Sequence, residues 1–365
     1  MTLPLHDFHQ SLGARFGELN GAELVTDYGD ALAEYTALHE TAGVLDFSFR
    51  GRLCVMGADR GRFLHGQITN DVKRLRVGEG CYAALLTAKG KMESDLNVLA
   101  LADELLLDFE PGFSAKIAAR LEKYIVADDV QVVDAAPHYG LFSVQGQKAG
   151  EVVRALNLFK ELPAKVLSSV KVSDAARGDI YLANHARLSP TTADSTLAGF
   201  DLFVPVAALG VVADQLINAA KALGGRACGW TAFETTRVEA GIPRFGADMD
   251  ETHLPLECGI EARAVSYNKG CYIGQEVINR IHSIGHVNRE LCRLRLADEL
   301  KSLPARGDRL FHAGKEVGSI TSAVKSPATR ANVALGYVRR EANQAGTELL
   351  LRTTAGESRA QVGTL

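Results

Sequence analysis

With 365 residues, the chain is longer than the size at which one hydrophobic core keeps growing, so we expect two or three domains. Its formal charge of −4 gives no overall attraction to nucleic acid or to anionic lipid. The N-terminus lacks a basic and apolar leader, and no uncharged apolar run approaches the roughly 18 residues of a membrane span. We therefore expect a cytoplasmic protein without a nucleic-acid or membrane partner.

The first elements in chain order alternate between helix and strand. Apolar residues recur at helical spacing over 31–42, and Gly43 ends this predicted helix. A short strand is expected at 44–48 and a second helix at about 59–69. Between residues 80 and 109, three apolar runs separated by short turns predict a β-meander.

The middle and the end of the chain differ in pattern. Pro111 is expected to open a helix, and two strands and another helix follow between residues 131 and 158. Residues 161–200 are the least patterned, and their stretch SPTTADSTLAG is predicted as an exposed loop. After Asn288, short strands broken by Gly, Asp or Asn predict a separate β-barrel or sandwich. The fold class is therefore α+β with an all-β end.

The common signatures of nucleotide, nicotinamide, hydrolase and zinc-protease sites do not occur in the sequence. His282 and His286 are four residues apart, but Gly285 interrupts them and no carboxylate stands at a matching spacing. The acidic string at 248–251 lacks the glycine and the closing glutamate of a calcium loop, so we interpret it as a solvated turn. No metal site is predicted.

The six cysteines form no CxxC pair, which indicates free thiols, and five of them lie in surroundings that favour core packing. Cys271 differs, because it lies in the segment NKGCYIGQE, which precedes apolar residues at four-residue spacing. A helix is expected to start near this cysteine with Asn268 as its cap. Helix amides and the nearby Lys269 would favour the thiolate. The alternative is that Cys271 fills a gap between helix and sheet.

These motifs together resemble the folate-binding YgfZ group of the glycine-cleavage T-protein (aminomethyltransferase-like) family. KGCYIGQE looks like the signature of that group, and the resemblance covers nearly the whole chain through GVLDFS, FLHGQITNDV, GKMESDLNV, GFDLFVP, RVEAGIPRFGADMD, LPLE and ALGYVR. It implies a three-lobed fold, in which two interleaved α+β domains surround a folate cavity and a C-terminal β-barrel follows. The expected domains are 1–50 with 137–240, 51–136 with 241–287, and 288–365.

The resemblance also implies a carboxylate at the folate site. Aminomethyltransferases carry an aspartate pair after two glycines, and the key aspartate lies close to the folate nitrogen that receives the one-carbon unit. Here the matching stretch GKMESD keeps one glycine and Asp95. A carboxylate at this place orients the pterin and stabilises developing positive charge. The lost neighbour counts against aminomethyl transfer, and an exposed turn residue is the alternative for Asp95.

Further folate-binding residues follow from the same resemblance. Asp201 would stand in for a family acid, since this chain lacks the Tyr-Thr-Gly-Glu stretch of aminomethyltransferases. Arg237 and Glu239 match the family pattern in RVEAG, and an arginine fork suits carboxylate or pterin acceptors. A structural pairing of Arg237 with Glu239 or Glu234 is the alternative.

The leading functional prediction is a protein that binds tetrahydrofolate, or a methylene or formyl derivative of it, and supports iron–sulfur cluster assembly or repair. Iron–sulfur apoproteins would be its partners. Cys271 would be the reactive thiol and Lys269 would tune it. Gln275 and Glu276 would orient neighbouring backbone or ligand groups.

The alternative function is a glycine-cleavage-type aminomethyltransferase, which moves a one-carbon unit from a lipoylated carrier protein to tetrahydrofolate. Asp95 and Arg237 would carry that reaction. A third function, a folate-dependent demethylase or oxidase-associated subunit, finds no flavin-binding motif in the chain. Whether the chain is an enzyme is open at this point.

Overall fold

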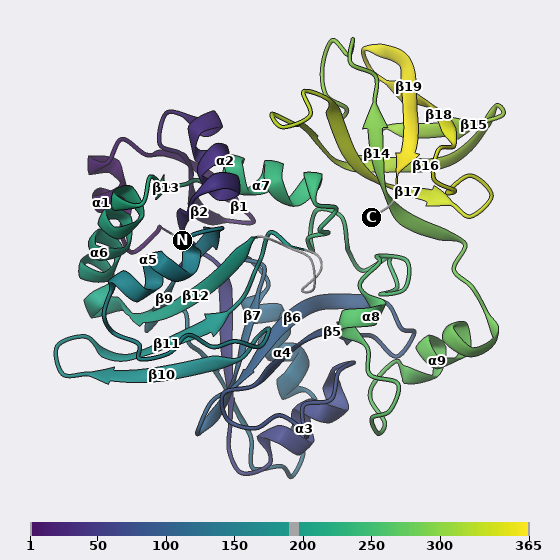
Figure 1. The fold of residues 1–365 in the computed structure, drawn as a ribbon. Helices are drawn as coiled ribbons and strands as arrows, with labels where there is room; N and C mark the ends of the chain where they lie inside the picture. Colours follow the sequence, from purple (N-terminus) through teal and green to yellow (C-terminus); the bar gives the residue numbers. More distant parts are fainter. Residues whose placement is uncertain (1, 190–196, 364–365) are drawn as a thin grey trace. The chain divides into compact units, whose positions relative to one another are not determined.

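The computed structural model describes residues 2–189 and 197–363 (Figure 1). The chain forms two compact units, Met1–Ala83 with Asp95–Glu234, and Ala84–Ser94 with Thr235–Leu365. The predicted α+β class with a C-terminal barrel is confirmed. The three-domain boundaries stay a prediction.

One sheet of the first unit has six strands in the order β10-β11-β12-β9-β3-β13. Helices α5 and α6 pack against this sheet (Figure 1), and the shared core contains Val144, Leu202 and Leu216. In α6 the buried residues recur every three or four positions, as an amphipathic helix on a sheet requires. The strands are β3 (Gly43–Asp46), β9 (Tyr139–Gly146), β10 (Ser169–Asp174), β11 (Gly178–Asn184), β12 (Ala198–Pro205) and β13 (Arg226–Ala227). The helices are α2 (Ala31–Glu40), α5 (Ala149–Ala155), η1 (Val206–Ala208) and α6 (Leu209–Ala222).

The second sheet has five strands in the order β5-β6-β7-β4-β8, so the predicted meander of β5, β6 and β7 is confirmed. Its strands are β4 (Gly51–Met56), β5 (Gly80–Leu86), β6 (Met92–Ala100), β7 (Glu104–Phe109) and β8 (Gln131–Asp134). The helices around it are α3 (Arg60–Gln67) and α4 (Ser114–Glu122). Pro111 does not open α4, because Pro111 and Gly112 form a turn and Phe113 is the N-cap. At the N-terminus lie α1 (His6–Ser11), β1 (Arg15–Leu19) and β2 (Ala22–Asp27).

The region at 161–200 is more regular than its sequence pattern indicates. It contains β10 and β11, which pair as an antiparallel hairpin at the end of the six-stranded sheet. Every second residue of β10 is exposed, from Lys171 to Ser173. These exposed residues alternate with Val170 and Val172, and in β11 Ile180 and Leu182 are buried, so both short strands carry the alternation of a half-buried sheet. Most of the predicted SPTTADSTLAG loop, residues 190–196, lies outside the described residues.

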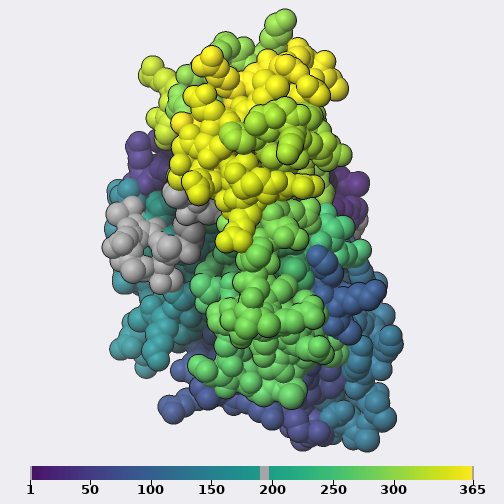
Figure 2. Space-filling view, turned by 90° about the vertical axis from the view of Figure 1, so that its right-hand side faces the viewer, coloured from purple at the N-terminus to yellow at the C-terminus, as the bar shows by residue number. Residues whose placement is uncertain are grey.

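The second unit contains a closed barrel in the order β14-β17-β16-β15-β18-β19, whose core includes Leu294, Ile320 and Leu351. Its strands are β14 (Arg289–Leu296), β15 (Arg309–His312), β16 (Lys315–Lys325), β17 (Asn332–Arg339), β18 (Glu348–Thr353) and β19 (Gly356–Gly363). Ahead of the barrel come α7 (Trp230–Glu239), α8 (Glu261–Ala264) and α9 (Gln275–Ile284). Figure 2 shows the green segment that carries α8 and α9 exposed to solvent. Among the described helices, none is long and apolar enough to cross a membrane.

Candidate functional site

The five-stranded sheet aligns polar side chains across neighbouring strands. The antiparallel pairings of β4 with β7 and of β6 with β7, continued past the strand ends, place Arg50, Glu110 and Asp95 in one row. Residues two positions apart on a strand face the same side. Arg52, Asp108 and Asn97 therefore form a second row on the same face. We call these six residues and Tyr82 the carboxylate face.

Asp95 is partly buried in this face, and the Tyr82 hydroxyl donates a hydrogen bond to its Oδ2 at 2.8 Å. Loss of solvent, and next the negative charge of Glu110, raise the pKa of Asp95 to about 6. The hydrogen bond from Tyr82 and the charge of Arg50 act in the opposite direction. A carboxyl that changes protonation near neutral pH is suited to acid–base or charge-stabilising chemistry.

Arg50 joins the two rows. Its Nε donates to Asp108 Oδ1 at 2.7 Å and its Nη1 to Glu110 Oε1 at 2.5 Å. Asn97 donates a further hydrogen bond to Asp108 at 3.0 Å. Although burial opposes ionisation, the charges of Arg187 and Arg50 hold the pKa of Asp108 well below its usual range. Arg50 and the ionised Asp108 therefore hold the side chains of the carboxylate face in place.

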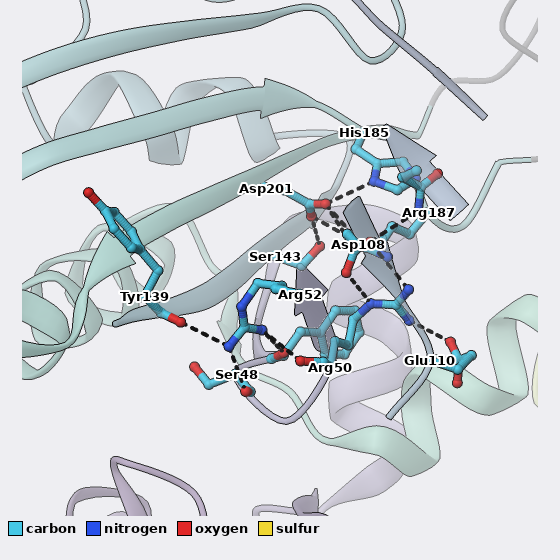
Figure 3. A network of polar contacts seen from close by, with 12 residues as sticks. Ser48, Arg50, Arg52, Asp108, Glu110, Tyr139, Ser143, His185, Arg187 and Asp201 are labelled. Carbon is cyan, nitrogen blue, oxygen red and sulfur yellow. Dashed lines mark hydrogen bonds and ion pairs between the residues drawn. The ribbon is translucent and has the colours of Figure 1, made fainter. Parts of the chain in front are cut away.

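Asp201 on β12 extends this network, as Figure 3 shows. Arg187 Nη2 lies 2.6 Å from Asp201 Oδ2 and 2.8 Å from Asp108 Oδ2. His185 Nδ1 and Ser143 Oγ also contact the Asp201 carboxylate, at 2.8 and 2.7 Å. With 1% of the residue exposed, Asp201 holds Arg187 in place, and its predicted contact with folate stays a prediction. Asp201 is thus linked through Arg187 to Asp108, which lies on the same carboxylate face as Asp95.

Arg237 and Glu239 lie on α7, where Glu239 is the last helical residue. Arg237 is buried, forms an ion pair with Asp248 and donates to Ser322 Oγ at 2.8 Å. Thr321 and Ser322 donate to the other oxygen of Asp248. The interpretation of 248–251 as a solvated turn is therefore wrong for Asp248, because its partners satisfy a fully buried carboxylate. In this structure Arg237 ties α7 to β16.

Cys271 is exposed, so the alternative that it fills a gap in the core is wrong. Core packing is confirmed for the four buried cysteines, and Cys81 is partly buried; the buried ones are Cys54, Cys228, Cys258 and Cys292. The buried Lys269 places its Nζ 4.8 Å from the ring centroid of Tyr272. Gln275 and Glu276 lie in the first turn of α9. They are the residues that we predicted to orient neighbouring backbone or ligand groups.

The start of α9 differs from the prediction. The helix begins at Gln275, four residues after Cys271, and its N-cap is Gly274 instead of Asn268. Gly274 has φ +88°, and a Cβ at this position would lie 2.6 Å from the carbonyl oxygen of Thr87. Only glycine fits this turn without strain. The backbone of the hairpin between β5 and β6 therefore dictates where the helix starts.

The described residues contain no cluster of three or more His, Cys, Asp or Glu side chains that would hold a metal ion. His282 is instead engaged by Glu261, with Nδ1 and Oε1 2.8 Å apart. Its ring also stacks on Tyr267, with centroids 3.8 Å apart.

Sequence reasoning missed most of the carboxylate face. Tyr82, Arg50 and Glu110 carry no motif, and neither does Arg187, which contacts Asp108 of the face. Tyr82 pairs with a residue 13 positions away, whereas the ion pairs of Arg50 and Arg187 with the face join residues 58 to 79 positions apart. The available signal was an ionisable residue within an apolar strand, such as Asp108 in LLLDF. Charged residues are almost never fully buried unless they are paired, so that pattern points to a buried network.

Comparison with known proteins gives two family matches. The GCVT N-terminal domain model matches residues 5–269, and the glycine cleavage T-protein C-terminal barrel domain model matches residues 289–364. An aminomethyltransferase of Halalkalibacterium halodurans is 27% identical over 98% of this chain and 95% of its own length. One of Symbiobacterium thermophilum is 28% identical over 95% of this chain and 91% of its own.

A solved structure is also similar in fold. The glycine cleavage system aminomethyltransferase T of Bartonella henselae superimposes with a TM-score of 0.88 at 23% identity. The match covers 100% of this chain and 97% of that one. The two proteins therefore share the same fold.

Proposed function

Because the chain belongs to the glycine cleavage T-protein family, we propose that it is a folate-dependent aminomethyltransferase that transfers a one-carbon unit between a lipoylated carrier protein and tetrahydrofolate. The relatives of nearly equal length named aminomethyltransferase support this reaction class. Asp95 carries the proposal. By the resemblance described above it is the retained member of the family's aspartate pair, and burial raises its pKa to about 6.

The hydrogen-bond acceptors of the carboxylate face fit the N–H groups of a reduced folate. A pterin ring presents N–H groups, and the carboxyl groups of Asp95 and Glu110 and the hydroxyl of Tyr82 lie on neighbouring strands. When bound, folate supplies the nitrogen that exchanges the one-carbon unit. The ionised Asp95 carboxylate stabilises positive charge that develops beside it. Burial, and next the charge of Glu110, which Arg50 holds in place, raise the pKa of Asp95 to about 6.

The test is the reverse transfer, in which methylenetetrahydrofolate, ammonia and the reduced lipoylated carrier yield tetrahydrofolate and an aminomethyl group on the carrier sulfur. Mass spectrometry of the carrier measures the product. We expect the rate to rise with pH through about 6, as Asp95 ionises. Glu110→Gln removes the neighbouring negative charge and should move this rise to lower pH. A pH profile that is identical in both proteins contradicts the role of Asp95.

A second candidate function rests on Cys271, which is the exposed member of the six cysteines. A thiol at the surface is free to meet a protein partner, as folate-linked maintenance of iron–sulfur clusters requires. The buried Lys269 lies two residues away in the chain. The test is complementation of a strain that lacks the native gene with Cys271→Ser. Full recovery of cluster-dependent enzyme activities by this variant would exclude the thiol role.

A further inference from the structure

A cavity lies at one end of the barrel, where β14 begins and β17 ends. It has a volume of about 750 Å³, within the range of small-molecule sites. We call it the rim groove. Its ionisable lining consists of Glu257, His286, Arg289, Arg339, Arg340 and Glu341. All of these residues belong to the second unit.

The rim groove places like charges together. In the pairing of β14 with β17, Arg289 lies directly opposite Arg339, and Arg340 follows at once. Like charges opposite each other on antiparallel strands are destabilising. A fold that keeps such a pair at its surface gives up some stability. Positions that break a local rule in this way are often functional ones.

The positive charge of Arg289 is partly balanced by contacts within the protein. Its Nε lies 3.2 Å from Glu257 Oε1, and its guanidinium carbon lies 5.0 Å from the ring centroid of Tyr337. Lys91 Nζ lies 3.9 Å from the other Glu257 oxygen. Glu257 therefore already has two cationic partners. Consequently, Glu257 has little negative charge left to balance Arg339 and Arg340.

Arg339 and Arg340 are exposed, and their guanidinium groups form no hydrogen bond or ion pair with the described part of the chain. The same holds for the side chains of His286 and Glu341. The consecutive residues Arg339 and Arg340 thus both line the groove, and of its two carboxylates Glu257 already pairs with Arg289 and Lys91. Each guanidinium presents a planar fork that matches carboxylate or phosphate oxygens with two parallel bonds.

We propose that the rim groove binds a small molecule with two adjacent anionic groups, carboxylates or phosphates, one on each of Arg339 and Arg340. The ligand relieves the cross-strand repulsion between Arg289 and Arg339. The rim groove shares no residue with the carboxylate face, so the proposal does not rest on the transfer reaction.

Isothermal titration of the full chain at about 0.1 M salt tests this site with two probes, inorganic pyrophosphate and a tetraglutamate peptide. We expect saturable binding of at least one probe. The double variant Arg339→Gln with Arg340→Gln should weaken that binding by at least about tenfold, since it removes two charge-assisted contacts. Binding of pyrophosphate alone would indicate that the natural ligand carries phosphoryl groups. Binding of tetraglutamate alone would indicate a polycarboxylate.

The matched control is Lys315→Gln with Arg359→Gln. These two cations are exposed on β16 and β19, outside the groove, and their removal changes the net charge of the chain equally. The control should bind each probe as the wild type does. Absence of saturable binding of both probes to the wild type overturns the proposal. Equal weakening in the two double variants also overturns it, because general charge attraction would then explain the binding.

Discussion

Asp95→Asn is expected to stabilise the first unit at neutral pH while it disables the proposed chemistry. The asparagine side chain has the same shape, its oxygen accepts the hydrogen bond from Tyr82, and its NH₂ group donates towards the acidic side chain of Glu110. The substitution therefore removes the charge that the folded state disfavours. A stabilising change at a functional residue is the expected trade-off when a site is kept strained for activity.

The size of this effect follows from proton linkage. The pKa of Asp95 rises from 3.8 to about 6 on folding, so the folded state binds the proton more tightly. Stability of the wild type therefore falls as pH rises between these two values and stays low above them. The full shift corresponds to about 3 kcal/mol at pH 7.5 and about half of that at pH 5. Because Asp95 is only partly buried, we expect a gain of about 1–3 kcal/mol at pH 7.5.

Urea unfolding followed by fluorescence measures this gain. The single tryptophan, Trp230, packs among Phe47, Phe49 and Phe233 and therefore reports on the first unit. Asp174→Asn is the control of opposite sign, because backbone hydrogen bonds from Arg177 and Ala176 lower the pKa of that carboxyl. Relative to the wild type, the control should be destabilised about equally at pH 5 and pH 7.5, because Asp174 is ionised in both the folded and the unfolded chain there, and less so as pH falls below about 4. The linkage reasoning would be refuted if Asp95→Asn gave no gain in the free energy of unfolding, or the same gain at pH 5 and at pH 7.5.

Three further predictions concern other parts of the molecule. Arg187→Met leaves Asp108 and Asp201 buried without their shared cation. The unfolding free energy from urea titration should drop by about 3–5 kcal/mol at pH 7 and by less as pH falls below about 4, where both carboxyls take up protons. Gly274→Ala should lower the melting temperature in circular dichroism more than Gly307→Ala does, since both glycines have positive φ but only the first would clash. A thiol reagent should label one cysteine rapidly in the wild type and none in Cys271→Ser, and two rapid thiols would contradict the exposure described above.

Local periodicity predicted the elements that depend on neighbouring residues only. The helix at 31–42 is observed as α2, and the β-meander is observed as β5, β6 and β7. These segments bury one face against a single core, so apolar spacing alone reports them. The hairpin of β10 and β11 was missed because its strands are short and their apolar residues, such as Val170, Val172, Ile180 and Leu182, stand only at alternate positions. β11 pairs with β12, the next strand along the chain, and β12 in turn pairs with β9.

The candidate site was less predictable for the same reason. Asp95 came from a family motif, whereas its partners Tyr82, Glu110 and Arg50 follow from the registers of four strands. The meander pattern predicts β5, β6 and β7 as neighbours, but no local pattern places β4 beside β7. The start of α9 likewise depends on contact between Gly274 and a backbone carbonyl far back in the chain. The sequence shows which residue types can carry the chemistry, but the positions of their side chains follow only from the folded structure.

Aminomethyl transfer to the carrier at pH 7.5, measured side by side in the wild type, Asp95→Asn and Cys271→Ser, tests the central claim most directly. We predict transfer by the wild type, a loss of about 100-fold or more in Asp95→Asn, and a rate within about twofold of wild type in Cys271→Ser. Unfolding by urea serves as the control that all three proteins are folded. An inactive wild type, or an Asp95→Asn variant as fast as the wild type, would contradict the proposed function.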